Sequence, residues 1–98
     1  MPENHTPALN GAESLVHTLV GNGLKVCFAN PGTSEMHFVA ALDRIPGLRC
    51  IPGQQENVVT GMADGFGRIA RDPAVTLLHC GPGLANGLAN LHNARKAH

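Results

Sequence analysis

Three short segments of this chain hold residues whose types and positions suit chemistry. Each follows an apolar run and contains glycine, a carboxylate or an imidazole: Asn30-Pro31-Gly32-Thr33, Gln55-Glu56 and His79-Cys80-Gly81-Pro82-Gly83. In open parallel α/β sheets, ligands bind beyond the carboxyl ends of the strands, because turns and helix N-termini meet there. If the apolar runs are parallel strands, an acid, a potential base and glycine-rich turns share one edge. That edge is the candidate site.

Glu56 is the most informative of these residues. It precedes a helix with a strongly apolar face. It is the only carboxylate at the three predicted strand ends apart from Glu35, which we expect further into a helix. The helix dipole alone also favours a glutamate in the first turn of a helix. Position by itself therefore leaves both a functional and a structural interpretation of Glu56 open.

His79 also has two interpretations. It alternates with Val75 and Leu77 along an apolar strand, which is typical of a core histidine with satisfied hydrogen bonds. At the mouth of a site, however, an imidazole can donate or accept a proton, since it titrates near neutral pH. Gly81-Pro82-Gly83 most simply forms a tight turn before the next helix, and its backbone N–H groups can meet a ligand. Asn86 is placed to bond to this turn, or is an ordinary solvated helix residue.

The elements that position these residues follow from periodicity and from glycine and proline stops. Apolar residues at helical spacing alternate with short continuous apolar runs, which predicts helices near 12–21, 33–42, 54–71 and 84–91 and strands at 26–29, 48–51 and 74–79. Strands and helices that alternate at these lengths imply parallel βαβ crossovers. The predicted fold class is α/β, an open doubly wound parallel sheet of three βα units with helices on both faces.

Composition limits the class of protein. The chain has 98 residues, 43% of them hydrophobic and only three aromatic, so we expect one domain with a core of Val, Leu, Ile and Ala. Seven basic and seven acidic residues cancel without a run of like charge, which argues against nucleic-acid or anionic-membrane partners. No signal-peptide pattern and no run of about 18 apolar residues occurs, so we expect a cytoplasmic protein.

Cysteine usage and the chain ends complete the prediction. Cys27, Cys50 and Cys80 lie in strand-like segments and predict three reduced core thiols, and without Cys-x-x-Cys spacing no metal-binding residue is predicted.

Residues 1–10 are expected to be a flexible leader before an ordered part, 11–98. After Asn93 there is no helix stop or further strand, and three parallel strands leave a bare edge. We therefore expect a fragment or an early-terminated product.

Taken together, three stretches resemble the pyrimidine-binding domain of thiamine-diphosphate-dependent enzymes. They are Phe28-Ala-Asn-Pro-Gly-Thr-Ser-Glu35, Gln55-Glu56-Asn-Val-Val-Thr-Gly-Met-Ala-Asp-Gly-Phe-Gly-Arg68 and Leu78-His-Cys-Gly-Pro-Gly-Leu-Ala-Asn86. They occur in the family's order, at spacings that suit βα units, and the likeness runs from about Gly11 to the end. It is to acetolactate synthase-like and benzoylformate decarboxylase-like members, and it implies part of that N-terminal domain.

The resemblance implies a role for each matching residue. Glu56 would hydrogen-bond N1′ of the cofactor's aminopyrimidine and favour the tautomer that removes the proton from C2 of the thiazolium ring. His79, as a catalytic group, and Thr33 would contact a 2-oxo acid substrate. Further cofactor-binding positions lie in the two glycine-containing turns and the last helix: Asn30, Pro31, Gly32, Gly81, Gly83 and Asn86. Which 2-oxo acid is used, and whether it is decarboxylated or ligated, stays open.

The resemblance also implies parts that this chain lacks. Family members bind Mg²⁺ and the diphosphate through a Gly-Asp-Gly…Asn segment of a separate C-terminal domain, typically from the partner subunit, and this segment is not in the sequence. The full-length form would be a homodimer or homotetramer. The isolated chain is expected to be inactive.

Two other functions are compatible with parts of the sequence. Gly81-x-Gly83 after a strand suits a nucleotide-binding Rossmann-type module, but the third glycine of that fingerprint would fall on Asn86, and no acidic residue follows about 20 positions later. A non-catalytic fragment that only associates with a full-length partner is the other alternative, since the Ala- and Gly-rich helix at 57–70 suits a subunit interface.

Overall fold

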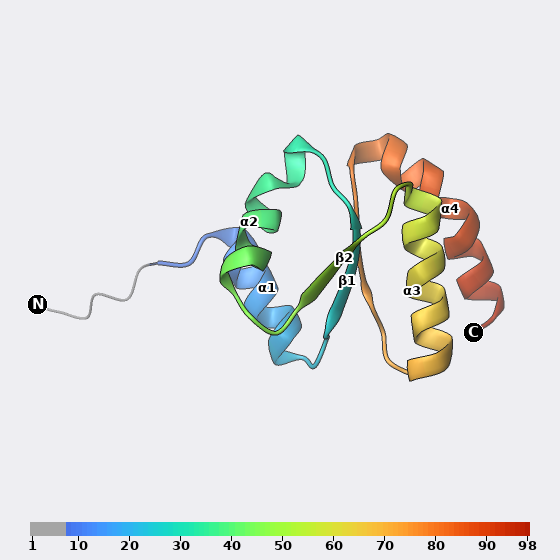
Figure 1. Ribbon diagram of the computed structural model, residues 1–98, viewed down its shortest axis with the longest axis horizontal. Coiled ribbons are helices and arrows are strands. Elements are labelled where there is room, and N and C mark those ends of the chain that lie inside the picture. Colours follow the sequence, from blue (N-terminus) through green and yellow to red (C-terminus); the bar gives the residue numbers. More distant parts are fainter. Residues whose placement is uncertain (1–7) are drawn as a thin grey trace, which may run out of the picture.

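The computed structural model describes residues 8–98, which form a parallel β-sheet between two pairs of helices. Figure 1 shows α1 and α2 on one face of the sheet and α3 and α4 on the other. The helices are α1 (Gly11–Gly21), α2 (Met36–Arg44), α3 (Glu56–Ala70) and α4 (Cys80–Lys96), with a 3₁₀ turn η1 (Thr33–Glu35) before α2. The strands are β1 (Val26–Asn30), β2 (Arg49–Pro52) and β3 (Val75–Leu78). This architecture confirms the predicted fold class.

β1 is the central strand and organises both halves of the core. The strand order is β2-β1-β3, and Cys27 of β1 pairs with Cys50 on one side and Val75 on the other. Because side chains alternate along a strand, Cys27 and Ala29 face one helical layer and Phe28 faces the other. The buried side chains that cluster with Cys27 and Ala29 come from α1, α2 and the loop before β2: Val16, Ala41, Ile45 and Leu48. On the second face, Phe28 meets Phe66 edge-on, with ring centroids 6.0 Å apart.

The first helix is fixed at its N-terminus and to α2 by Glu13. The Asn10 side chain accepts from the Glu13 N–H at 2.8 Å, and the Glu13 carboxylate accepts from the Asn10 N–H at 3.2 Å, which is a capping box. The same carboxylate accepts two hydrogen bonds from Arg44 at the end of α2, at 2.7 and 3.0 Å. Glu13 therefore joins the two helices of this layer.

Acid should weaken this junction. The Asn10 N–H, and next the Arg44 guanidinium, hold the pKa of Glu13 below its usual value. The unfolded chain, with a glutamate pKa of about 4.3, therefore takes up protons first as the pH falls. The stabilisation from Glu13 is present above the pKa of the unfolded chain. It is lost as the pH falls through the lower pKa of the folded chain. We expect Glu13→Gln to remove part of the acid-induced drop in the urea midpoint. An unchanged drop in this variant would contradict the assignment.

The structure corrects several predicted details. α4 begins at Cys80, so Gly81-Pro82-Gly83 forms its first turn and is not a separate turn before the helix. Proline is tolerated there, because the first N–H groups of a helix have no partner within the helix. The reversal of the chain occurs at Cys80 instead, whose φ of 58° lies in the left-handed region.

The prediction of three core thiols is confirmed only for Cys27. All three cysteines are free, but Cys50 and Cys80 are exposed, because β2 is an edge strand and Cys80 lies at the start of α4. The apolar face predicted for the helix at 54–71 is also incompletely buried, since Val58 and Ile69 of α3 are exposed. Residues 1–7 of the predicted leader lie outside the described residues, and residues 8–10 precede α1.

Among the helices of residues 8–98, none is long and apolar enough to cross a membrane. The cytoplasmic location stays a prediction.

Candidate functional site

The carboxyl ends of the three strands meet at one edge of the sheet, the top edge in Figure 1. β1 ends at Asn30, β2 at Pro52 and β3 at Leu78, and all three strands are parallel. The predicted segments therefore gather at this edge, where η1, α3 and α4 begin. Their side-chain contacts form two groups, one around Glu56 and one around His79.

Glu56 is the first residue of α3 and lies beside the first turns of α4. Its carboxylate Oε1 accepts a hydrogen bond from Asn86 Nδ2 at 3.3 Å. Gly83 is buried beside it, and a Cβ added there would lie 3.5 Å from Glu56 Oε2. The Gln55 side chain caps α3 by accepting from the Asn57 N–H at 2.7 Å. The carboxylate is thus half-buried at a helix N-terminus, where the helix dipole favours negative charge.

Close packing of α3 on α4 fixes this arrangement. Thr60 is buried, and its hydroxyl donates to the carbonyl of Gly87 at 2.9 Å. Asn90 donates from its backbone N–H to Asn57 Oδ1 at 3.0 Å and from its side chain to the Asn57 carbonyl at 2.7 Å. A Cβ added at Gly87 would lie 3.0 Å from Thr60 Cγ2, so the missing side chain permits the close approach. The position of Asn86 relative to Glu56 therefore depends on the helix pair.

His79 lies at the end of β3 and is the N-cap residue of α4. Its Nδ1 is 2.8 Å from Glu35 Oε2, and the same oxygen accepts the Gly32 N–H at 2.8 Å. The Gly32 N–H first, and then the His79 imidazole, hold the pKa of Glu35 below its usual value. A Cβ added at Gly32 would lie 2.3 Å from His79 Nδ1, so glycine is needed for the imidazole to sit there.

The thiol of Cys80 completes this second group. Cys80 Sγ is 3.6 Å from Ser34 Oγ, and it lies 3.6 Å from Nδ1 and 3.7 Å from Nε2 of His79. Glu35, His79 and Cys80 together present possible metal-ligand atoms within 4.8 Å of one another. His79 Nδ1 and Glu35 Oε2 are 2.8 Å apart and hydrogen-bonded to each other, so a metal ion would have to replace that bond. The observed arrangement is a hydrogen-bonded carboxylate–imidazole pair with a thiol beside it.

The structure joins some of the predicted site residues and leaves others apart. It brings Glu56 together with Gly83 and Asn86, and His79 together with Gly32. The other predicted positions lie along the same edge: Asn30, Pro31, Thr33 and Gly81. Of these, only Asn30 and Thr33 have polar side chains, and neither side chain makes a hydrogen bond within residues 8–98. Glu35 and Asn57 were not predicted as site residues. Glu35 meets His79 across 44 positions of sequence, and no local pattern indicates that contact.

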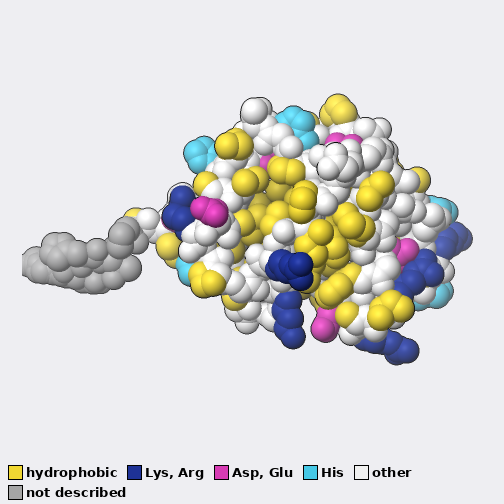
Figure 2. All heavy atoms as spheres, in the orientation of Figure 1, with side chains coloured by type: hydrophobic (Ala, Val, Ile, Leu, Met, Phe, Trp, Pro, Cys, Tyr) yellow, Lys and Arg dark blue, Asp and Glu magenta, His cyan; other side chains and the backbone are white. Residues whose placement is uncertain are grey.

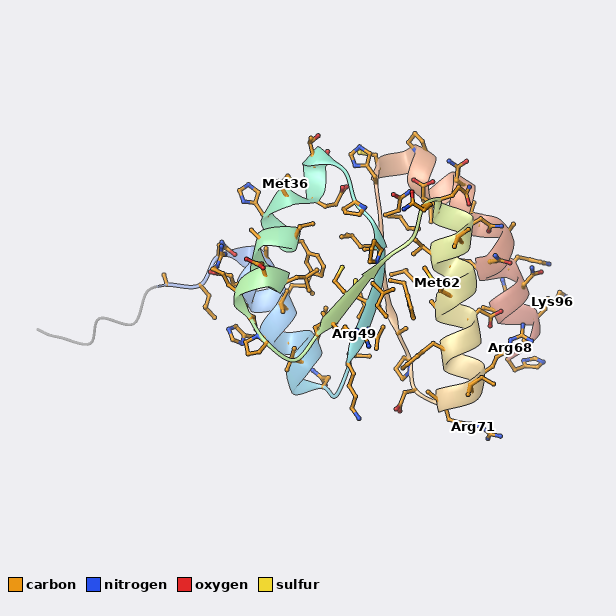
Figure 3. All side chains as sticks on the ribbon, viewed as in Figure 1. Met36, Arg49, Met62, Arg68, Arg71 and Lys96 are labelled. Atoms are coloured by element: carbon orange, nitrogen blue, oxygen red, sulfur yellow. The ribbon has the colours of Figure 1, made fainter. Side chains whose placement is uncertain are left out.

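The edge around Glu56 carries no arginine or lysine. The segments 30–35, 53–57 and 79–83 contain no Lys or Arg. Figure 3 shows the labelled Arg49, Arg68, Arg71 and Lys96 away from the top edge, and the Lys and Arg side chains visible in Figure 2 also lie below that edge. Two hollows in the described part of the chain, of about 680 and 500 Å³, do not include Glu56, although the second reaches Ser34 and Glu35. We therefore describe the Glu56 side of the edge as an open shelf.

Comparison with known proteins identifies the kind of chain to which this edge belongs. Residues 9–98 match the family model described as "Thiamine pyrophosphate enzyme, N-terminal TPP binding domain". The chain is 65% identical over 89 residues to a putative acetolactate synthase large subunit of Mycobacterium tuberculosis, which covers 91% of this chain and 17% of the relative. It is 40% identical over 77 residues to benzoylformate decarboxylase of Pseudomonas aeruginosa, covering 79% of this chain and 14% of the relative.

A third relative, the acetolactate synthase large subunit of Buchnera aphidicola subsp. Acyrthosiphon pisum, is 33% identical over 86 residues. The match covers 88% of this chain and 15% of that relative. The chain thus spans less than a fifth of the length of each of these relatives. The family match agrees with the resemblance seen in the sequence and gives no support to a Rossmann-type nucleotide-binding module.

Proposed function

We infer the function of this chain from its family: it belongs to the thiamine pyrophosphate enzymes, within their N-terminal cofactor-binding domain. We propose that it is the N-terminal part of a 2-oxo acid decarboxylase or carboligase in which Glu56 activates thiamine diphosphate, the same compound as thiamine pyrophosphate. The observation that carries this proposal is a half-buried carboxylate at the carboxyl end of β2, beside the glycine-rich start of α4.

The residues at this edge fit one end of that cofactor. A flat aminopyrimidine needs a carboxyl partner and a surface without bulky side chains, and Glu56 beside Gly83 offers both. The diphosphate needs cationic partners, yet no Lys or Arg lies in the three segments that form the edge. This division supports our proposal that Mg²⁺ and the diphosphate are held by a separate C-terminal domain, from the partner subunit of a homodimer or homotetramer.

The contacts of Glu56 suit the transfer of a proton to and from a ring nitrogen. Asn86 donates to Oε1, which leaves Oε2 beside Gly83 for a ligand. The carboxyl group would share a proton with N1′ of the aminopyrimidine, and the N-terminus of α3 would stabilise its charged form. Bound thiamine diphosphate supplies the carbon nucleophile and the electron sink of the reaction. Glu56 therefore acts on the cofactor and not on the substrate.

We assign the substrate end of the site to the second group. The imidazole of His79 would donate or accept a proton at a 2-oxo acid, and the exposed hydroxyl of Thr33 would contact the same substrate. The names of the relatives support a 2-oxo acid, since benzoylformate is one and one relative is a benzoylformate decarboxylase. The acetolactate synthase relatives equally support a ligation reaction, so the proposal covers both outcomes.

A graft into a full-length relative tests the proposal. Residues 9–98 would replace the matching segment of benzoylformate decarboxylase, with which the chain is 40% identical over 77 residues. We expect the grafted enzyme to release CO₂ from a 2-oxo acid only when thiamine diphosphate and Mg²⁺ are present. A folded graft that assembles like its parent but does not take up the cofactor would contradict the proposal.

The isolated chain gives a second, simpler test. Because it offers no cationic partners for the diphosphate at this edge, we expect no turnover of 2-oxo acids by the purified 98-residue protein with cofactor and Mg²⁺. Measured CO₂ release above the cofactor-only background would refute the division of the site between two domains.

A further inference from the structure

The imidazole of His79 has three neighbours whose contacts the family match does not explain. Glu35 Oε2 lies 2.8 Å from Nδ1. Gly32 leaves the space that a Cβ would fill at 2.3 Å from Nδ1. Cys80 Sγ lies 3.6 and 3.7 Å from the two ring nitrogens. Despite these contacts, the His79 side chain keeps 38% of its surface exposed and is accessible to a ligand.

The partner of Nδ1 decides which ring nitrogen carries the proton. The Gly32 N–H, which approaches Glu35 Oε2 at 2.8 Å, and the His79 ring both stabilise the ionised carboxylate and lower its pKa. An ionised carboxylate only accepts hydrogen bonds, so Nδ1 must be the donor. That holds for the neutral ring and for the charged ring alike. In the neutral ring Nε2 is then the basic nitrogen. Cys80 Sγ lies 3.7 Å from it and is only a weak hydrogen-bonding partner.

We propose that Glu35 is a positioning residue that keeps a proton on Nδ1 of His79, so that Nε2 is the atom at which His79 exchanges a proton with substrate. A base that is oriented by a third group is a general device of catalytic sites. The statement about the substrate rests on the proposed function. The statement about the tautomer does not, since it concerns only the hydrogen bond between the Glu35 carboxylate and the His79 ring. Gly32 belongs to the same device, because it admits the ring next to the carboxylate.

The tautomer can be measured in the 98-residue chain without cofactor or turnover. Ring ¹⁵N chemical shifts of His79, recorded at about pH 9, well above the ordinary imidazole range, distinguish a protonated Nδ1 from a protonated Nε2. An unconstrained neutral histidine favours the Nε2–H form. We expect the opposite, an Nδ1–H majority, in the wild-type chain, and a reversal to an Nε2–H majority in Glu35→Ala.

Two further variants separate positioning from general damage. Glu13→Ala is the matched control, because Glu13 also accepts from a backbone N–H three residues before it, at 3.2 Å, but belongs to α1. It should leave the His79 tautomer unchanged. Gly32→Ala keeps the carboxylate and displaces the ring by the clash at Nδ1, so it should also reverse the tautomer.

An Nε2–H majority in the wild-type chain would overturn the proposal without any variant. So would an Nδ1–H majority that survives in a folded Glu35→Ala chain. Neither result would bear on Glu56, and an inactive graft would not change the tautomer result. The failure of this inference and the failure of the proposed function are therefore distinguishable.

Discussion

Glutamine in place of Glu56 is expected to lower the turnover of a full-length enzyme that carries residues 9–98 by about 100- to 10,000-fold, the usual contribution of a positioned acid or base. Glutamine keeps the shape of the side chain, and its carbonyl can still accept from Asn86 Nδ2, which lies 3.3 Å from Glu56 Oε1. It cannot take up and return a proton. The loss should therefore appear in kcat and in the rate of hydrogen–deuterium exchange at C2 of the bound cofactor, while the melting temperature stays close to that of the parent.

The matched control for this variant is Glu13→Gln. Glu13 also lies in the first turn of a helix, but its carboxylate binds Arg44 and the N-terminus of α1. That substitution should leave kcat and the exchange rate near the parent values. If both variants had similar kcat values, the carboxylate at the start of α3 would have no part in cofactor activation.

The second large effect concerns stability. Phe28→Ala is expected to lower the free energy of unfolding by about 3–5 kcal/mol, the usual cost of truncating a buried phenylalanine. Phe28 is 7% exposed on the central strand, and its ring packs edge-on against Phe66 of α3 at 6.0 Å. The variant removes the main aromatic contact between β1 and the layer that carries Glu56. Urea unfolding followed by circular dichroism measures the change.

Leu84→Ala provides the comparison for Phe28→Ala. Leu84 is 50% exposed on α4, so its truncation should change the free energy of unfolding by less than about 0.5 kcal/mol, as is usual for surface positions. A cost below about 1 kcal/mol for Phe28→Ala would show that the second helical layer does not depend on this contact.

The sequence was sufficient to predict the elements that place Glu56. The apolar runs near residues 26–29, 48–51 and 74–79 became the three strands, because continuous runs bounded by glycine and proline have few alternatives in an α/β chain. Parallel pairing then places the ends of these strands at one edge. The position of Glu56 beside Gly83 and Asn86 follows from that pairing and from the contact between α3 and α4.

Contacts between distant segments and the burial of particular side chains could not be predicted in this way. Glu35 looked like an ordinary helix residue, and only the fold brings it within 2.8 Å of His79. Cys50 was expected in the core because its segment is apolar, but β2 is an edge strand and leaves it exposed. Gly81-Pro82-Gly83 looked like a turn, but the left-handed conformation of Cys80 reverses the chain earlier and lets α4 start there.

The helix pair also explains why the site extends beyond the predicted residues. Asn57 and Thr60 hold α4 through Asn90 and Gly87, and these bonds set the distance between Asn86 and Glu56. Sequence patterns identify Thr60 only as one more residue of a helix. Its hydroxyl becomes important because it is buried 2.9 Å from a carbonyl of the neighbouring helix.

The distance between Glu56 and the aminopyrimidine in a cofactor-bound crystal structure of the graft tests the central claim most directly. We expect a carboxyl oxygen of Glu56 within hydrogen-bond reach of N1′, about 2.6–3.2 Å, with Asn86 still bonded to the other oxygen. A bound cofactor whose N1′ meets a different group, with the Glu56 carboxylate turned away from the ring, would contradict the account.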